Sequence, residues 1–273
     1  MQGVLSTLDA LRERVSVLEG RGTTMGDVEN TPIRLPFGIP EIDHLIAGGL
    51  LLAEMHEVRC STARDIASAT GFVIGILSGL LRQIEHDKPV FWVSEGKSIL
   101  DSGCLYPDGL AWFGIDPARI IYVHPLHLQD ALWAAGEAAC SGGLAATVLH
   151  VKGNHKAFDL AVSRKLMLRA QKGEAPLFLL RQAGQNEASS AVTRWHVAPL
   201  PSLPDQQFEK GVGHMRLSLT LEKNRNGQTG HWPVAWNPEK RLFQHAAKRV
   251  SNPHSHMPFH ASSHRSNTQT AAR

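Results

Sequence analysis

The side chains best suited to catalysis or metal binding in this sequence are fifteen histidines and three cysteines. The cysteines Cys60, Cys104 and Cys140 stand far apart and form no CxxC pair, which argues against a disulfide framework and a structural zinc site. Four histidines gather near the carboxyl end: His254, His256, His260 and His264. No carboxylate or cysteine joins them, so we expect no specific metal site. No HExxH, GxSxG or Cys–His arrangement occurs, and no conventional catalytic residues are expected.

Charge is divided unevenly along the chain. Residues 1–140 contain 10 lysines and arginines against 18 acids, whereas residues 141–273 contain 18 against 7 and ten of the histidines. The net charge of +3 therefore hides a basic second half. Such a half is typical of a chain that meets a polyanion, or of one whose basic end meets the acidic end of a neighbour. A merely solvated basic face is the alternative.

Length and composition limit the class of protein. The 273 residues, of which 42% are hydrophobic, suit one core-forming domain with appendages or at most two small domains. The longest uncharged stretch, residues 66–81, is interrupted by Ser, Thr and Gly and is too short for a membrane span. The amino terminus contains acids and lacks an export signal. We therefore expect a cytoplasmic protein with no membrane partner.

The two ends of the chain differ from its middle. Residues 1–20 predict a helix with an apolar heptad seam formed by Val4, Leu8, Leu11, Val15 and Leu18. Two heptads are marginal alone, so this helix either covers its own domain or docks on another subunit. Residues 21–34 predict a linker. Residues 246–273, rich in Ser, His, Asn and Thr, predict a disordered tail.

Strands and helices alternate between about residues 35 and 245. Five apolar strands are predicted: Met55–Arg59, Pro89–Ser94, Arg119–Val123, Leu144–Val151 and Pro176–Arg181. Three helices are predicted among them: Asp65–Glu85, Gln129–Cys140 and Lys156–Lys172. This order indicates an α/β fold with a parallel sheet covered on both faces. Alternating segments then predict an antiparallel extension: Thr193–Val197, Arg216–Glu222 and His231–Trp236, with a turn at Asn226-Gly227.

The segment from Leu35 to Val58, LPFGIPEIDHLIAGGLLLAEMHEV, resembles the entry to the RecA-type ATPase core. Seven positions match the family pattern: Gly38, Ile42, Asp43, Leu45, Gly48, Gly49 and Leu50. The resemblance continues through residues 111–149 and covers about Pro36 to Phe243. It implies a RecA-like core over residues 35–245, preceded by the amino-terminal helix.

The nucleotide site of that family is where this sequence departs from the pattern. A phosphate loop needs backbone N–H groups, a lysine for the phosphates and a hydroxyl for magnesium. Here Cys60 and Asp65 replace its two glycines, Ile66 replaces the lysine and Ala67 the hydroxyl. His150 stands where the magnesium aspartate belongs. An acid at this place would repel a triphosphate, so we expect no nucleotide, no cofactor and no ATP hydrolysis.

Other positions still match the family. By the resemblance, Glu95 corresponds to the glutamate that activates water, and Gln182 to the glutamine that senses nucleotide. Lys223 and Arg225 resemble the basic pair that enters a neighbour's nucleotide site and stabilises phosphate there. The alternatives are a solvated carboxylate at Glu95 and an ordinary basic hairpin flank at Lys223 and Arg225.

Several segments are similar to ImuA, the RecA-like family of bacterial inducible mutagenesis cassettes. They are the opening LDALRERVSVLEGR, the entry at residues 35–58, ATGF at Ala69–Phe72 and RWHVAPLPS at Arg194–Ser202. This resemblance implies a non-catalytic accessory protein of SOS-induced translesion synthesis and mutagenesis. It implies an ImuB-like Y-family polymerase homologue as partner and, through that complex, an error-prone polymerase III alpha-type subunit, with RecA as a further candidate.

Two loops are candidates for binding single-stranded DNA, because RecA-like proteins present loops in these places to DNA. Their basic residues are Lys152, Lys156, Arg164, Lys165, Arg181 and Arg194. Such residues would give affinity that depends on salt but not on sequence, and Trp195 or His196 would stack a base. The alternatives are that Trp195 packs in the core and that His150 is a buried strand histidine with a hydrogen-bond partner.

Two other function classes stay open. One is a divergent RecA-like ATPase or DNA-binding protein of recombinational repair. The other is a free-standing single-stranded DNA binder or a division inhibitor. Binding of an ATP analogue would separate an ATPase from an accessory protein, since the accessory role predicts no binding at millimolar nucleotide.

Overall fold

The computed structural model describes residues 32–84, 88–203, 211 and 213–246. The predicted heptad helix, most of the predicted linker and all but the first residue of the predicted tail lie outside the described residues. Arg34, the last residue of the predicted linker, already belongs to a strand. That strand, β1 (Arg34–Leu35), pairs antiparallel with β2 (Leu50–Leu51).

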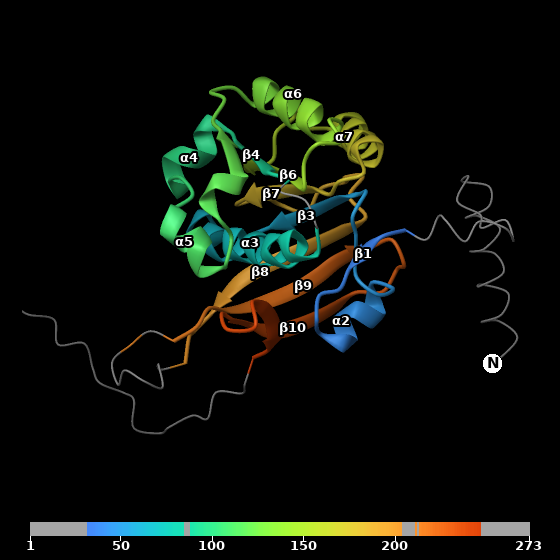
Figure 1. Cartoon of the computed structure of the whole chain (residues 1–273). Coiled ribbons are helices and arrows are strands. Elements are labelled where there is room, and N and C mark those ends of the chain that lie inside the picture. Colours follow the sequence, from blue (N-terminus) through green and yellow to red (C-terminus); the bar gives the residue numbers. More distant parts are fainter. Residues whose placement is uncertain (1–31, 85–87, 204–210, 212, 247–273) are drawn as a thin grey trace, which may run out of the picture.

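One nine-stranded sheet organises the described part of the chain, in the order β11-β10-β9-β8-β3-β7-β6-β4-β5 (Figure 1). Its strands are β3 (Met55–Arg59), β4 (Val90–Ser94), β5 (Ile120–Val123), β6 (Ala146–Lys152), β7 (Leu177–Gln182), β8 (Thr193–Leu200), β9 (Arg216–Asn224), β10 (Gly230–Asn237) and β11 (Leu242–His245). The pairs β3–β7, β7–β6, β6–β4 and β4–β5 are all parallel. The predicted parallel sheet is therefore confirmed.

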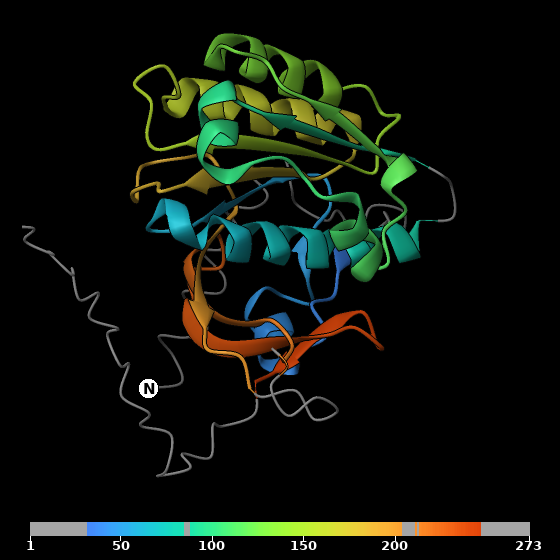
Figure 2. The ribbon, with the colours of Figure 1, turned by 90° about the vertical axis from the view of Figure 1, so that its left-hand side faces the viewer.

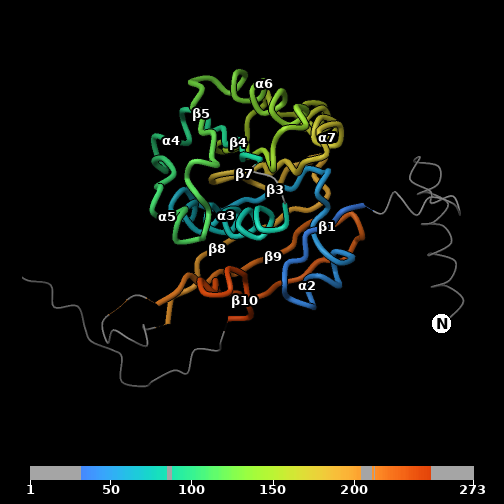
Figure 3. Tube along the Cα trace, in the orientation of Figure 1, coloured from blue at the N-terminus to red at the C-terminus, as the bar shows by residue number. Residues whose placement is uncertain are grey.

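The antiparallel part of the sheet begins one strand later than predicted. β8 pairs parallel with β3 through His56–Thr193 to Arg59–His196, and antiparallel with β9 on its other side. The prediction of an antiparallel strand from Thr193 was wrong in this respect, because β8 returns to the same direction as β3 after a crossover. Figure 3 shows these two distant segments side by side. The predicted turn is confirmed: Gly227 has φ +83° and lies between β9 and β10.

Helices cover both faces of the sheet (Figure 2). α3 (Ile66–Gln83) lies on one face of the sheet, where it contacts the strands β8 and β11. α6 (Leu128–Ala139) and α7 (Leu160–Gly173) lie on the other face. α7 starts four residues later than predicted because the Asp159 carboxylate accepts a hydrogen bond from Val162 N at 2.8 Å and caps the helix there. Short elements fill the connections: α2 (Pro40–Leu45), α4 (Gly96–Ser102), α5 (Pro107–Trp112) and the 3-10 turns Ala63–Asp65 and Pro117–Arg119.

α3 is the central helix of the larger hydrophobic core. Gly75 lets the last strand approach it, because a Cβ at this position would lie 2.6 Å from the Phe243 ring. Among the described residues, Ala63–Gln83 is also the one helical stretch long and apolar enough to cross a membrane. In this structure 67% of its apolar window is buried inside the protein, so its composition follows from its place in the core.

The entry segment before β3 is held together by its own residues. The Asp43 carboxylate accepts hydrogen bonds from Phe37 N at 2.6 Å and Gly38 N at 3.0 Å. Gly49 has φ +139°, and a Cβ there would lie 2.4 Å from the Leu35 carbonyl oxygen. These matching positions of the family pattern therefore have a structural purpose in this chain.

Candidate functional site

The connection from β3 to α3 stands at the position of the phosphate loop in the RecA-type pattern. Cys60 is fully buried, and its backbone N–H donates to Arg181 O at 3.2 Å. A 3-10 turn follows, in which the Thr62 hydroxyl donates to the Asp65 carboxylate at 2.9 Å. Ile66 then packs in the apolar core at 6% exposure, while Ala67 is exposed. The residue in the lysine's place thus faces inward, and a carboxylate stands at the beginning of α3.

His150 lies on β6 inside the protein, 4% exposed. Ser94 Oγ lies 3.4 Å from its Nδ1 and also accepts hydrogen bonds from Trp92 Nε1 at 3.1 Å and the Tyr122 hydroxyl at 3.2 Å. Burial lowers the pKa of His150 to about 4, with a smaller opposing effect of the Gln182 amide. The prediction of a buried strand histidine with a hydrogen-bond partner is confirmed. A neutral imidazole stands here in place of a carboxylate.

Glu95 follows the end of β4, and Gln182 is the last residue of β7; these two strands lie on either side of β6. Glu95 is 2% exposed; its Oε2 accepts from Lys152 N at 3.3 Å and lies 3.3 Å from His155 Nε2. The alternative of a solvated carboxylate at Glu95 was therefore wrong. Gln182 is fully buried. The structure thus keeps these two family positions close to the sheet's carboxyl edge.

A buried arginine–glutamate cluster joins β3, β7 and β8 on the α7 face. Glu57, with no exposed surface, forms ion pairs with Arg181 Nε and Arg194 Nε at 2.9 Å each. Ser189 Oγ donates to the same carboxylate at 2.6 Å, and Lys223 Nζ donates to the Ser189 carbonyl at 2.6 Å. Sequence analysis missed Glu57, although an acid inside the apolar strand MHEVR was a usable signal.

This cluster accounts for several basic residues with predicted roles. Arg181 and Arg194 are 1% and 4% exposed, so in this structure these two DNA candidates lie in the interior. Arg181 also lies over the Phe158 ring at 4.6 Å. Lys223 contacts the cluster, and Arg225 lies 3.4 Å from the Glu54 carboxylate. Lys223 and Arg225 therefore contact their own chain here.

The other four DNA candidates lie at or near the surface along residues 152–165. Lys156, Arg164 and Lys165 are exposed, whereas Lys152 pairs with Asp101 at 2.5 Å. The loops after β6 and β7 are joined by Asn154 and Gln185, with Gln185 N donating to Asn154 Oδ1 at 2.7 Å. The structure thus brings both candidate loops together while separating their basic side chains.

The two residues considered for base stacking both contact other residues of the chain. Trp195 has no exposed surface and stacks on Phe37 at 5.8 Å, which confirms its alternative role in the core. His196 Nε2 lies 2.7 Å from Ser61 Oγ, and burial lowers its pKa. Trp195 therefore offers no stacking surface to a base in this structure.

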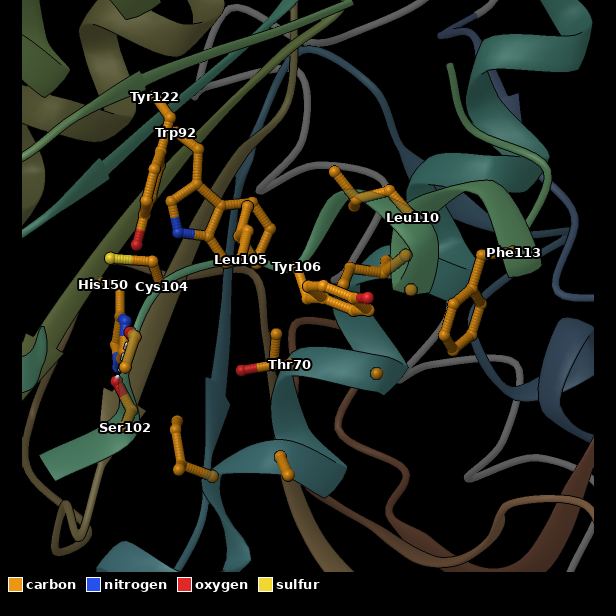
Figure 4. A pocket seen from close by; sticks show the side chains of 16 residues that line it. Thr70, Trp92, Ser102, Cys104, Leu105, Tyr106, Leu110, Phe113, Tyr122 and His150 are labelled. Atoms are coloured by element: carbon orange, nitrogen blue, oxygen red, sulfur yellow. Dashed lines mark hydrogen bonds between the residues drawn. The ribbon is translucent and has the colours of Figure 1, made fainter. Parts of the chain in front are cut away.

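A cavity of about 330 Å³ opens on the α3 face of the sheet. It lies between the first half of α3, the strands β4 and β5, and residues 102–113 (Figure 4). Six of its lining residues carry aromatic, imidazole or thiol groups: Trp92, Cys104, Tyr106, Phe113, Tyr122 and His150. Across the residues that the structure describes, no group of three or more His, Cys, Asp or Glu side chains is arranged to hold a metal ion.

Comparisons with known proteins support the fold. No protein-family model matches the chain, and a search of curated proteins gives no match. Among solved structures, the chain is similar to the RadB recombinase, with a TM-score of 0.53 and 15% sequence identity over 78% of this chain and 100% of that one. At this identity the likeness concerns the fold, and it confirms the predicted RecA-like α/β architecture.

Proposed function

We propose that this RecA-like chain is a non-catalytic accessory protein of DNA repair, acting in SOS-induced translesion synthesis and mutagenesis. The observation that carries the proposal is the β3–α3 connection, with Asp65 at the start of the helix and Ile66 in the core. A helix start can bind an anion through its free N–H groups. The Asp65 carboxylate makes no hydrogen bond to these groups in the structure, but its negative charge at that place repels phosphate.

We propose that the protein acts by binding other proteins. We propose an ImuB-like Y-family polymerase homologue as the direct partner and an error-prone polymerase III alpha-type subunit reached through it. RecA is a further candidate partner. Large apolar side chains stand on the surface, among them Leu100 at 87%, Leu126 at 79% and Trp133 at 69% exposure. Such side chains are typical of surfaces that bind another protein when they gather in patches.

Weak binding of single-stranded DNA would accompany these contacts. Lys156, Arg164 and Lys165 are exposed on the loop and the first turns of α7. Cations without base-reading groups give affinity that depends on salt and not on sequence.

The first test is genetic. In a strain deleted for this gene, we expect damage-induced mutations to disappear while recombination proficiency remains. Complementation with the intact gene restores the mutations. Unchanged mutagenesis with lowered recombination would contradict the accessory role and favour a repair recombinase.

A second test concerns the predicted heptad helix, which lies outside the described residues. Leu11→Asp with Val15→Asp places two charges in its apolar seam, and we expect loss of binding to the ImuB-like protein in a pull-down of purified proteins. Arg12→Ala, beside the seam, is the control. An unchanged unfolding midpoint shows that the core is intact; persistent binding would mean that the helix only covers its own domain.

A divergent ATPase is the second candidate function. Its support is the buried Glu95, which keeps the place of a water-activating glutamate near Gln182. A fluorescent ATP analogue titrated to millimolar concentration separates the two, with a RecA protein as positive control. We expect no binding by this chain, and saturable binding would favour the ATPase.

A further inference from the structure

The cavity on the α3 face has the size and walls of a binding site. Its volume of about 330 Å³ falls at the small end of ligand sites, which span roughly 300–1,000 Å³. Trp92, Tyr122 and Phe113 form aromatic walls, and Ile66 and Leu110 add aliphatic surface. Figure 4 shows Trp92 and Tyr122 on the strands facing Thr70 of α3 and Leu110 of α5 across the cavity. An apolar group of one or two rings suits such walls.

Among the residues that the structure describes, no lysine, arginine, aspartate or glutamate lines the cavity. Its polar groups are the hydroxyls of Thr70, Ser102 and the tyrosines, the Cys104 thiol and His150. Burial lowers the pKa of His150 to about 4, so the imidazole is neutral near pH 7. A charged group would lose its water here without gaining a counter-charge, which is strongly unfavourable. The occupant of the cavity is therefore uncharged.

Exposed apolar side chains stand in and beside the segment that forms the mouth. Leu100, Tyr106 and Trp112 are 87%, 67% and 45% exposed. Tyr106 itself lines the cavity, and Trp112 packs edge-on against Phe113 at 4.9 Å. A small molecule held inside the cavity would leave this rim exposed. A protein segment would cover the rim while one side chain fills the pocket, as at interface hot spots.

Carboxylates flank the lining residues in sequence. The Asp65 carboxylate accepts from the Thr62 hydroxyl at 2.9 Å, and the Asp108 carboxylate accepts from the Tyr106 hydroxyl at 2.5 Å. In the described part of the chain neither forms an ion pair, whereas Asp101 already pairs with Lys152. These two carboxylates favour a partner with cations beside its buried group.

We propose that this cavity is a docking site for one aromatic side chain of a partner protein, presented on a segment with lysine or arginine on both sides. The proposal rests on the accessory role proposed above and names the chemistry of the partner segment. The aromatic ring enters the uncharged cavity, its flanking backbone covers Leu100 and Trp112, and its cations face Asp65 and Asp108.

Cys104 reports occupancy directly, because its thiol lines the cavity and is exposed. The full-length chain is alkylated with iodoacetamide, and the modified cysteines are quantified by peptide mass spectrometry. The probe is a capped Lys-Ser-Phe-Ser-Lys peptide at millimolar concentration, which we expect to slow Cys104 alkylation at least threefold. Cys140, outside the cavity lining, provides the internal control and should react at an unchanged rate.

Two matched peptides test the two halves of the proposal. Replacing the phenylalanine of the probe by alanine should abolish protection, and replacing its lysines by glutamates should weaken it several-fold. Asp108→Asn in the chain should reduce the difference between the lysine and glutamate peptides. Equal protection by the alanine peptide would overturn the aromatic assignment.

Filling the cavity should abolish docking without unfolding the protein. Gly109 lines the cavity in α5, and a Cβ there would meet only Tyr106, at 3.9 Å. Gly109→Leu therefore projects into open space and improves helix propensity. We expect at least a tenfold loss of peptide affinity with the unfolding midpoint retained. Gly143→Leu, which would meet nothing within 4 Å of its Cβ, is the control and should bind normally.

Other occupants give different outcomes. Protection by adenosine at lower concentration than the phenylalanine peptide would overturn the proposal in favour of a nucleoside site. Faster Cys104 alkylation in Phe259→Ala would overturn it in favour of the chain's own basic carboxyl-terminal segment. No protection by any ring would exclude docking at the cavity. Because the peptide assay needs no cellular partner, its failure is distinct from a failure of the genetic test.

Discussion

The two faces of the central sheet treat polar side chains in opposite ways. On the α7 face, Glu57 is enclosed by Arg181, Arg194 and Ser189, and Lys223 completes the cluster. On the α3 face, the cavity is lined by aromatic, hydroxyl, thiol and imidazole groups without a formal charge. The first region is a set of charged side chains that pair with one another inside the fold. The second is a cavity with uncharged walls that is accessible to another molecule.

The difference shows that residue type alone is a poor guide to a binding surface. Arginines are typical of phosphate sites, yet here two of them bind a glutamate of a neighbouring strand. The cavity is instead lined by residue types that are typical of a hydrophobic core. Experiments that weaken each region separately should therefore affect stability on one face and binding on the other.

The largest effect is expected from Glu57→Gln. This substitution leaves two arginines buried without their carboxylate, which typically costs about 3–5 kcal/mol of unfolding free energy. Urea unfolding measures it. Glu137→Gln is the control, because its ion pair with Arg169 is partly exposed, and a loss of about 1 kcal/mol or less is expected there. Equal losses of unfolding free energy in the two variants would contradict the larger contribution of the buried cluster to stability.

Acid should destabilise the protein through two buried histidines. Burial lowers the pKa of both His56 and His150 from 6.5 to about 4. The unfolded chain therefore takes up protons first as the pH falls, so the contribution of these two histidines to stability is constant above about pH 7 and declines between pH 6.5 and 4. Each histidine accounts for about 3 kcal/mol at most.

The variant His150→Gln sharpens this prediction by removing one of the two titrating groups. The decline in unfolding free energy between pH 7 and 4.5, followed by urea titrations, should be about half that of the parent chain. An unchanged decline would mean that His150, beside the cavity, is not held neutral by burial.

Tyr122→Phe should cost less than either change. The Tyr122 hydroxyl donates to Ser94 Oγ at 3.2 Å, but Ser94 keeps its bond from Trp92 Nε1. Loss of one half-buried hydrogen bond costs about 1 kcal/mol. Thermal unfolding measures the change. A loss as large as that of Glu57→Gln would show that the cavity wall is as important for stability as the cluster.

The smallest effect concerns DNA. Replacing Lys156, Arg164 and Lys165 by alanine should weaken single-stranded DNA binding several-fold in low-salt fluorescence anisotropy, and all binding should vanish by about 0.2 M salt. The matched control removes the same charge elsewhere: Lys88, Lys97 and Lys240. Equal weakening in the control would mean that net charge, and not this surface, attracts DNA.

Most of the fold was predictable because its strands are apolar runs between helices. The ends of β3 were predicted correctly, and those of β4 to β7 to within two residues. The parallel pairing of β8 was not predictable, because its partner lies far away in the sequence. α4 and α5, with 7 and 6 residues, are too short to show a clear helical period.

The candidate site was predictable where strand ends determine it. The positions of three site residues follow from the predicted strands: Asp65 and Ile66 come after β3, and His150 lies in β6. Ile66 is buried, as expected of an apolar side chain. The interior position of Arg194 was not predictable, because Glu57 is 137 residues away. Nor was the cavity, since it exists only where the first half of α3 meets residues 102–113.

The position of β3 between β7 and β8 also bears on how the chain is synthesised. β3 leaves the ribosome early, but its partner residues in β7 lie 122 positions later in the sequence and those in β8 lie 137 positions later. During this interval its backbone N–H and C=O groups lack their final partners, and such open edges pair readily with other chains. A ribosome stalled before residue 193 would therefore release an aggregation-prone fragment, and solubility of nascent chains should rise sharply once β8 has emerged.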